Sequence, residues 1–96
     1  MLKIRYTKKA VSDLVEAYEY ISGDSQQNAE MVIARIEKAA DSLCLYPDIG
    51  RKGRKDTTRE FVVTGTPFIL VYRHNANYLR ILTVLHRSRQ YPADYL

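Results

Sequence analysis

The N-terminal half of the chain shows two kinds of hydrophobic spacing. Residues 2–6 alternate between apolar and basic side chains, and this period of two predicts a half-buried strand. Residues 10–21 and 29–43 carry apolar side chains three or four positions apart, which is the spacing of helices with one buried face. Because only a few residues separate these two stretches, we expect the helices to form an antiparallel αα-hairpin.

Polar residues and a proline mark the ends of the predicted helices. Thr7 is suited to cap the first helix and Asp24 or Ser25 the second, because their side-chain oxygens can accept hydrogen bonds from the first turn. Pro47 has no backbone donor, so the second helix is expected to end near Tyr46.

The C-terminal half predicts three strands joined by tight turns. The first lies near residues 58–63, and residues 64–67 have the composition of a turn. Residues 68–72 form a continuous apolar run, which is typical of an interior strand covered on both faces. After a turn at residues 74–77, alternation divides the last strand into two sets: Leu79, Ile81, Thr83 and Leu85 on one face, and Arg80, Leu82, Val84 and His86 on the other.

The resulting element order is β-α-α-β-β-β, and the 96 residues are expected to form a single domain, residues 1–96. This order predicts an α+β fold in which the αα-hairpin packs on one face of a mainly antiparallel sheet.

The net charge of +4 conceals an asymmetry between the two halves. Residues 1–48 contain six basic and eight acidic residues, whereas residues 49–96 contain nine and three. A basic C-terminal half favours a nucleic acid or an acidic protein as partner, although a solvated basic face is the simpler interpretation for a protein of modest net charge. Residues 47–57, predicted to be a mobile exposed loop, could likewise grip a phosphate backbone or merely be solvated.

The single cysteine, Cys44, excludes an intramolecular disulfide and suits a reducing compartment. The N-terminal residues lack the apolar core of a secretory signal, and no apolar stretch has the length of a membrane span. We therefore expect a cytoplasmic protein that does not bind membranes. The two histidines and Cys44 are not at metal-ligand spacing, and no glycine-rich phosphate loop is present, so we expect neither metal nor cofactor.

The best candidate chemistry is RNA cleavage by in-line attack of a 2′-hydroxyl. That reaction needs a base, an acid and cations that stabilise the charged phosphate of the transition state. The end of the last strand and its neighbours supply suitable groups, which could meet on one face of a small sheet. These catalytic candidates are Arg59, Arg73, His86, Arg87 and Tyr91. Arginines that flank the core and a tyrosine that anchors the C-terminus would look the same in sequence.

Nearly the whole chain resembles the ParE/RelE superfamily of bacterial type II toxin–antitoxin toxins. The resemblance rests on the first helix at residues 10–21, on Tyr46, Pro47 and residues 49–51 after the second helix, and on the three C-terminal strands. It implies the same β-α-α-β-β-β fold. It also implies one of two activities: RelE-like members cleave mRNA in the ribosomal decoding site, whereas ParE-like members act on DNA gyrase and block replication.

Comparison with the nuclease pattern favours the ParE side. Arg59 and Arg87 match basic positions of RelE-like nucleases, and Tyr91 resembles their C-terminal tyrosine. Phe61 occupies a second basic position, however. The arginine that RelE-like members carry just before the Leu-Val-Tyr of the next strand corresponds here to the apolar Phe68 or Ile69. The resemblance therefore implies a gyrase-directed binding inhibitor that is not an enzyme, with a ribosome-dependent mRNA endoribonuclease as the alternative and an inactive toxin as a third possibility.

The resemblance also implies a cognate antitoxin as partner, and no sequence-specific DNA binding by the toxin itself. A flexible, acidic antitoxin segment that folds on binding suits the basic half of this chain. The residues expected to contact the antitoxin are Leu14, Tyr18, Arg59, Arg73, Arg80 and Arg87. Those expected to contact the target are Arg51, Lys52, Arg54, Lys55 and Arg89.

Overall fold

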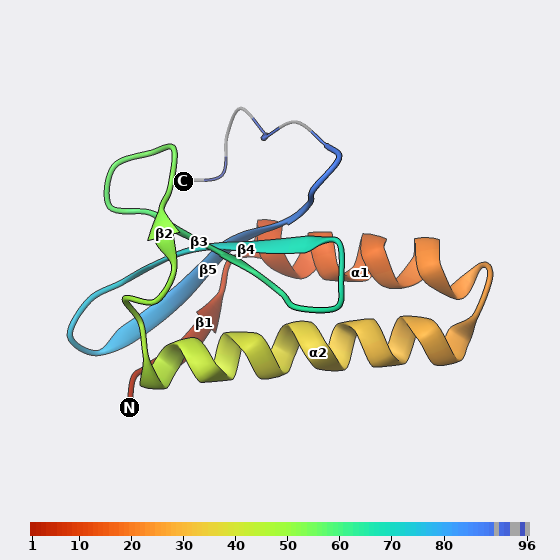
Figure 1. The fold of residues 1–96 in the computed structure, drawn as a ribbon, viewed down its shortest axis with the longest axis horizontal. Helices are drawn as coiled ribbons and strands as arrows, with labels where there is room; N and C mark the ends of the chain where they lie inside the picture. Colours follow the sequence, from red (N-terminus) through yellow and green to blue (C-terminus); the bar gives the residue numbers. More distant parts are fainter. Residues whose placement is uncertain (90, 93–94, 96) are drawn as a thin grey trace.

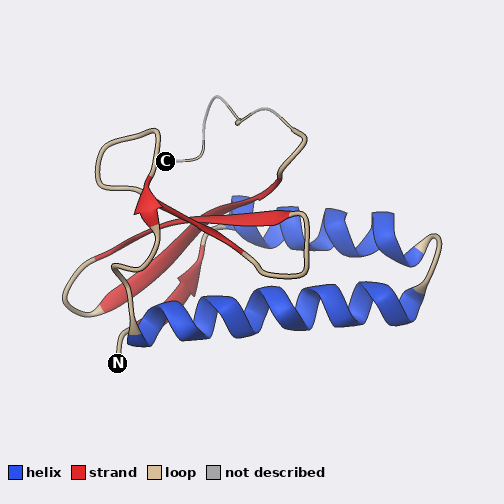
Figure 2. Ribbon diagram, viewed as in Figure 1, coloured by secondary structure: helices blue, strands red, loops and turns tan. Residues whose placement is uncertain are grey.

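The computed structural model describes residues 1–89, 91–92 and 95, and their fold is a helical hairpin packed on one face of a sheet (Figures 1 and 2). The elements are β1 (Lys3–Tyr6), α1 (Lys8–Ser22), α2 (Gln26–Leu45), β2 (Arg51–Lys52), β3 (Arg59–Val62), β4 (Phe68–His74) and β5 (Tyr78–His86). In the described part of the chain the sheet has five strands, in the order β1-β5-β4-β3-β2. The predicted α+β class and its element order are confirmed, and β2 is an additional short strand.

The N-terminal strand closes one edge of the sheet. β1 runs parallel to β5, with Ile4 opposite Leu79 and Tyr6 opposite Ile81, whereas all other neighbouring strands are antiparallel. β4 and β5 lie in the interior of the sheet. This placement confirms the interpretation of the apolar run at residues 68–72 as a strand covered on both faces, because Phe68 to Tyr72 are all buried.

The helix ends follow the predicted capping residues. The Thr7 hydroxyl oxygen accepts a hydrogen bond from the Ala10 N–H, and that of Ser25 accepts one from the Asn28 N–H, so Ser25 rather than Asp24 caps α2. The Thr7 hydroxyl also donates to the Leu82 carbonyl, 2.8 Å away, which ties the start of α1 to β5. α2 ends at Leu45, two residues before Pro47.

The main core lies between the helices and the sheet. Small side chains of α1, Ala10 and Ala17, let this helix approach the strands closely, and larger side chains of α2 and the sheet fill the remaining space. The buried members of this core include Ile36, Ala40, Leu43, Cys44, Leu70, Tyr72, Leu79 and Ile81. Val11, at the edge of the predicted apolar stripe of α1, is instead half exposed beside Val15.

The predicted strict alternation of β5 is wrong because the β4–β5 ladder contains a bulge. Val71 pairs with Thr83 and Tyr72 with Ile81, so Leu82 is the extra residue. Beyond the bulge the two faces exchange: Val84 joins Ile81 in the core under the helices, and Leu85 joins Leu82 on the opposite face. Between Ile81 and Leu85, this strand therefore has apolar side chains on both faces.

Residues 47–57 are not a loop throughout, since Arg51–Lys52 form β2, and side chains from β3 and β4 are hydrogen-bonded to the preceding turn. Within the described residues, no helix is both long and apolar enough to span a lipid bilayer.

Candidate functional site

The face of the sheet without helices carries most of the basic side chains of the strands. Strand register determines which side chains lie on this face, because cross-strand partners share a face and successive residues of one strand point to opposite faces. Val71 pairs with Glu60, Glu60 with Arg51, and Arg80 with both Arg5 and Arg73. The basic residues placed on this helix-free face are therefore Lys3, Arg5, Arg51, Arg73, Arg80 and Arg87, against a single strand carboxylate, Glu60.

Two C-terminal tyrosines, Tyr91 and Tyr95, cover the centre of the helix-free face. Tyr91 and Tyr95 pack against an apolar cluster of Ile69, Val71, Leu82 and Leu85. The guanidinium of Arg54 lies 3.8 Å from the centre of the Tyr91 ring, and the ammonium of Lys55 lies 4.3 Å from that of Tyr95. These cation–π contacts connect the loop after β2 to the C-terminal segment.

A cleft of about 490 Å³ opens beside this cover. Its lining combines cations with one buried acid: Arg51, Lys52, Gly53, Arg54, Glu60, Ile69, Arg87, Arg89 and Tyr91. The Glu60 side chain is only 4% exposed, and its Oε1 accepts a hydrogen bond from Arg51 Nη2 at 3.1 Å. One buried carboxylate among four arginines leaves the cleft strongly positive, so it suits an anionic ligand.

Tyr91 is held in its neutral form in this cleft. Three effects together raise the pKa of its hydroxyl to about 12. Burial is the largest, and the others are the hydrogen bond that Tyr91 donates to Glu60 and the negative charge of that carboxylate. The nearby Arg54 and Arg51 act in the opposite direction but do not outweigh these effects. At neutral pH, Tyr91 is therefore a hydrogen-bond donor and not a base.

The turn before β2 is clamped from the other face of the sheet. The buried Tyr72 hydroxyl accepts from the Gly50 N–H and donates to the Pro47 carbonyl, 2.6 Å away. Arg59 Nη1 donates to the carbonyl of Gly50, and the Asp48 carboxylate lies near both Arg59 and His74. A Cβ at Gly50 would come within 2.5 Å of the Tyr72 hydroxyl, so only glycine fits there.

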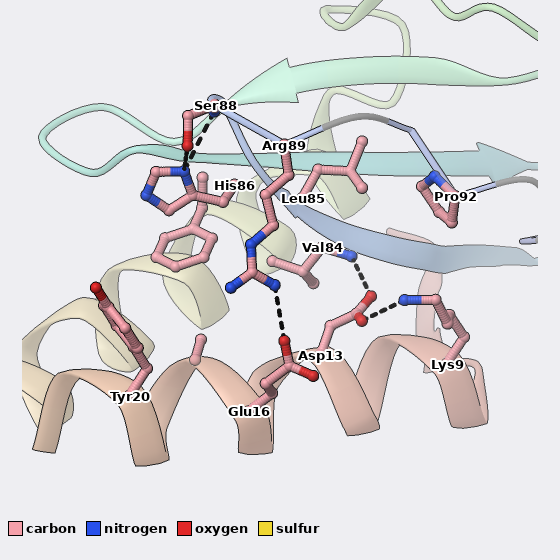
Figure 3. A pocket seen from close by; sticks show the side chains of 12 residues that line it. Lys9, Asp13, Glu16, Tyr20, Val84, Leu85, His86, Ser88, Arg89 and Pro92 are labelled. Carbon is pink, nitrogen blue, oxygen red and sulfur yellow. Dashed lines mark hydrogen bonds and ion pairs between the residues drawn. The ribbon is translucent and has the colours of Figure 1, made fainter. Parts of the chain in front are cut away.

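A second pocket of about 380 Å³ lies between α1 and the end of β5 (Figure 3). Figure 3 shows Arg89 extending to Glu16 of α1, with Nη1 and Oε1 2.8 Å apart. His86 packs edge-on against Phe68, and its Nδ1 is hydrogen-bonded to Ser88. Both partners of the Arg89–Glu16 pair are exposed, so it contributes little to stability.

The structure brings together some of the predicted catalytic residues and separates others. Arg87 and Tyr91 line the cleft, and Arg73 lies on the same face, farther from the cleft. Arg59 and His86 lie on the helix-covered face, opposite Tyr72 and Phe68 in register. The expectation that all five converge on one face is therefore wrong.

The other predicted contact residues fall in several places. Of the residues expected to contact a target, Arg51, Lys52, Arg54 and Arg89 line the cleft, whereas Lys55 lies over Tyr95. Leu14 is half buried against the main core, so much of its surface is already used by the fold. Sequence reasoning missed Glu60, although alternation from Arg59 would have placed it on the helix-free face.

Comparisons with known proteins agree with this architecture. The model of the family described as "ParE toxin of type II toxin-antitoxin system, parDE" matches residues 4–91. The Y4kP protein of Sinorhizobium fredii is 42% identical over 90 residues, covering 94% of this chain and 93% of that protein. Toxin RelE2 of Caulobacter vibrioides is 33% identical, covering 93% and 99%.

A solved structure shares the fold at lower sequence identity. A chain from the chromosomal ParDE TA system of P. aeruginosa superposes with a TM-score of 0.80 at 21% identity, covering 90% of this chain and 96% of that one. The helical hairpin and mixed sheet are thus those of a ParE/RelE superfamily toxin. The chain belongs to the ParE toxin family of type II toxin–antitoxin systems.

Proposed function

We propose that this ParE-family toxin inhibits DNA gyrase by binding to it, blocks replication and growth, and catalyses no reaction itself. The observation that supports the proposal is the division of the predicted catalytic residues between the two faces of the sheet. Arg59 is engaged with the turn at residues 48–50, and His86 packs on Phe68 beneath the helices, whereas Arg87 and Tyr91 lie across the sheet. One phosphate could not contact all of them.

The chemistry of the cleft supports the same proposal. Transesterification of RNA needs a base that is free to accept a proton near neutral pH. Tyr91 is protonated, with its pKa raised to about 12 chiefly by burial, and Glu60 is already occupied by Arg51 and Tyr91. A cleft with these properties binds an anionic or acidic surface more readily than it cleaves a phosphodiester. We propose it as the contact with gyrase, through Arg51, Arg54 and Arg87.

An antitoxin partner follows from membership of a type II toxin–antitoxin family. We propose that the antitoxin lays an amphipathic helix along α1, where Val11, Val15 and Tyr18 are spaced four and three residues apart. Val11 and Val15 are 49% and 53% exposed, so both are accessible to a partner helix. This spacing matches helix-in-groove recognition. We place the toxin in the cytoplasm, where both gyrase and ribosomes are found.

One observation favours a second function, that of a ribosome-dependent mRNA endoribonuclease. The cleft does place Arg87 and Tyr91 beside a buried carboxylate, Glu60, so a smaller catalytic set is present. In that mechanism Arg87 would stabilise the phosphate charge and Tyr91 would donate a proton.

A supercoiling assay with purified DNA gyrase separates the two functions. We expect near-stoichiometric toxin to inhibit supercoiling and to trap cleaved DNA, and Tyr91→Phe to retain this inhibition because its ring still packs on the sheet. A parallel assay of mRNA cleavage on programmed ribosomes should show no cleavage. Cleavage that is lost in both Arg87→Ala and Tyr91→Phe would establish the nuclease instead. If neither assay responds and expression without antitoxin leaves growth unchanged, the toxin is inactive.

A further inference from the structure

Three arginines form a row across the helix-free face, at the sheet edge that β1 closes. Arg5 of β1 lies opposite Arg80 of β5, and Arg80 lies opposite Arg73 of β4. We call these three residues the arginine row. Because neighbouring strands lie about 4.8 Å apart, the row spans three strands within about 10 Å. Lys3 and Tyr78 form the adjacent cross-strand pair, and Arg5 lies 4.7 Å from the Tyr78 ring centre.

This arrangement is unfavourable for folding. Like charges placed directly opposite each other on neighbouring strands repel. In the described part of the chain, no carboxylate forms an ion pair with Lys3, Arg5, Arg73 or Arg80. Arg73 Nε is buried without a hydrogen-bond partner among the same residues. A bound anion would compensate for both the repulsion and the unused donor.

The chemistry of the arginine row favours a nucleic acid over an acidic protein. Protein partners are held mainly by apolar anchors buried at the centre of an interface. Among the described residues beside the row, Val71 and Leu82 are already buried in the cluster under Tyr91 and Tyr95, and Tyr78 is stacked with Arg5. A guanidinium binds phosphate oxygens through two parallel hydrogen bonds. Residues 8–45, on the opposite side of the sheet, contain four basic and seven acidic residues. The resulting field orients the row toward a polyanion.

We propose that the arginine row, with Lys3 beside it, binds the phosphate backbone of a nucleic acid without regard to sequence. The site is distinct from the cleft at Glu60 and does not depend on which target the toxin inhibits. A toxin of this kind would hold the nucleic acid against its sheet while its cleft contacts another molecule.

The test is fluorescence anisotropy of the full-length toxin with labelled 20-nucleotide duplex DNA, single-stranded DNA and RNA, at several salt concentrations. The test variant combines Arg5→Gln, Arg73→Gln and Arg80→Gln. The matched control combines Lys8→Gln, Arg35→Gln and Lys38→Gln, which removes the same charge from exposed positions on the helices. For the nucleic acid that binds, we expect the test variant to bind at least about tenfold more weakly. Its salt slope should fall by about one per lost phosphate contact.

The control variant should retain most of the affinity and the wild-type slope. The test variant should also unfold at an equal or higher temperature than the wild type, because the repulsion is gone. Equal loss in the two triple variants, or no binding of any nucleic acid by the wild type at low salt, would overturn the proposal. It would also be overturned if the row variant lost affinity for the cognate antitoxin but not for nucleic acid, since the row would then be a protein contact.

Discussion

The two faces of one sheet differ in what their side chains do. On the helix-covered face, most of the side chains of β4 and β5 are apolar and buried under α1 and α2, and the polar Tyr72 and Arg59 are engaged with a backbone turn. On the helix-free face, the same strands present arginines, one buried carboxylate and an apolar cluster against which Tyr91 and Tyr95 pack. Most side chains of the first face stabilise the fold, whereas the basic side chains of the second face are available to bind another molecule.

This difference changes how an arginine in the sequence should be interpreted. Arg59 matched a nuclease position by resemblance, yet its guanidinium is hydrogen-bonded to the carbonyls of Asp48 and Gly50. Arg87, on the opposite face, lines the cleft and is exposed. The face on which Arg59 and Arg87 lie therefore indicates whether the guanidinium is already used by the fold, which their positions in a motif do not.

The largest expected effect compares one leucine from each face. Leu70→Ala removes a fully buried side chain from the centre of the main core, and we expect it to lower the free energy of unfolding by about 3 kcal/mol. Leu85→Ala on the helix-free face should cost roughly half as much or less, because the side chains of Tyr91 and Tyr95 can settle into the space. Urea unfolding measures both. Equal losses would mean that the helix-free face is a second core and not a binding surface.

A smaller effect is expected where α1 meets the bulge of β5. Asp13 accepts hydrogen bonds from the Thr83 hydroxyl and the Val84 N–H, and also pairs with Lys9. Asp13→Ala leaves these largely buried donors without a partner, so we expect a loss of about 2 kcal/mol in unfolding free energy. Glu16→Ala, one turn farther along α1, breaks only the exposed pair with Arg89 and should change stability by less than about 0.5 kcal/mol. Similar losses in the two variants would contradict this assignment.

Substitution of one arginine on each face should affect stability in one case and activity in the other. Arg59→Ala loses hydrogen bonds to the clamped turn and should cost about 1 kcal/mol of unfolding free energy. Arg87→Ala should leave the melting temperature nearly unchanged, since Arg87 is exposed, yet it should weaken growth arrest. Thermal unfolding and growth curves after induction without antitoxin measure both properties. The assignment fails if Arg87→Ala unfolds earlier than Arg59→Ala.

The smallest expected effect is a pKa change confined to one face. Tyr91 and Tyr6 both have pKa values raised from 10.0 to about 12, with burial as the largest cause in each. Glu60→Gln removes the neighbouring charge of Tyr91 and should move its pKa toward 10, leaving that of Tyr6 unchanged. Because the raised pKa favours the neutral form, Tyr91 stabilises the fold below pH 10, and this contribution disappears as the pH rises toward 12. NMR titration of the tyrosine ring carbons resolves the two residues, and a parallel shift in Tyr6 would refute the coupling.

The sequence predicted the elements well because each has a local signal. Thr7, Ser25 and Pro47 mark helix ends, and the apolar run at residues 68–72 marks a strand buried on both faces. The bulge at Leu82 could not be predicted, because both Leu82 and Val84 are apolar and either alternation satisfies a buried strand. The pairing of Glu60 with Arg51 and Tyr91 was also missed, since it joins residues from three separate segments.

The most direct test of the account compares gyrase inhibition by variants of the two faces. One variant carries Arg51→Gln and Arg87→Gln at the cleft, and the other carries Lys8→Gln and Lys38→Gln on the helices, so both lose two positive charges. In a supercoiling assay, the account predicts that the cleft variant needs at least about tenfold more protein for half inhibition, whereas the helix variant stays within about twofold of the wild type. Loss of inhibition in the helix variant, with the cleft variant unaffected, would contradict it.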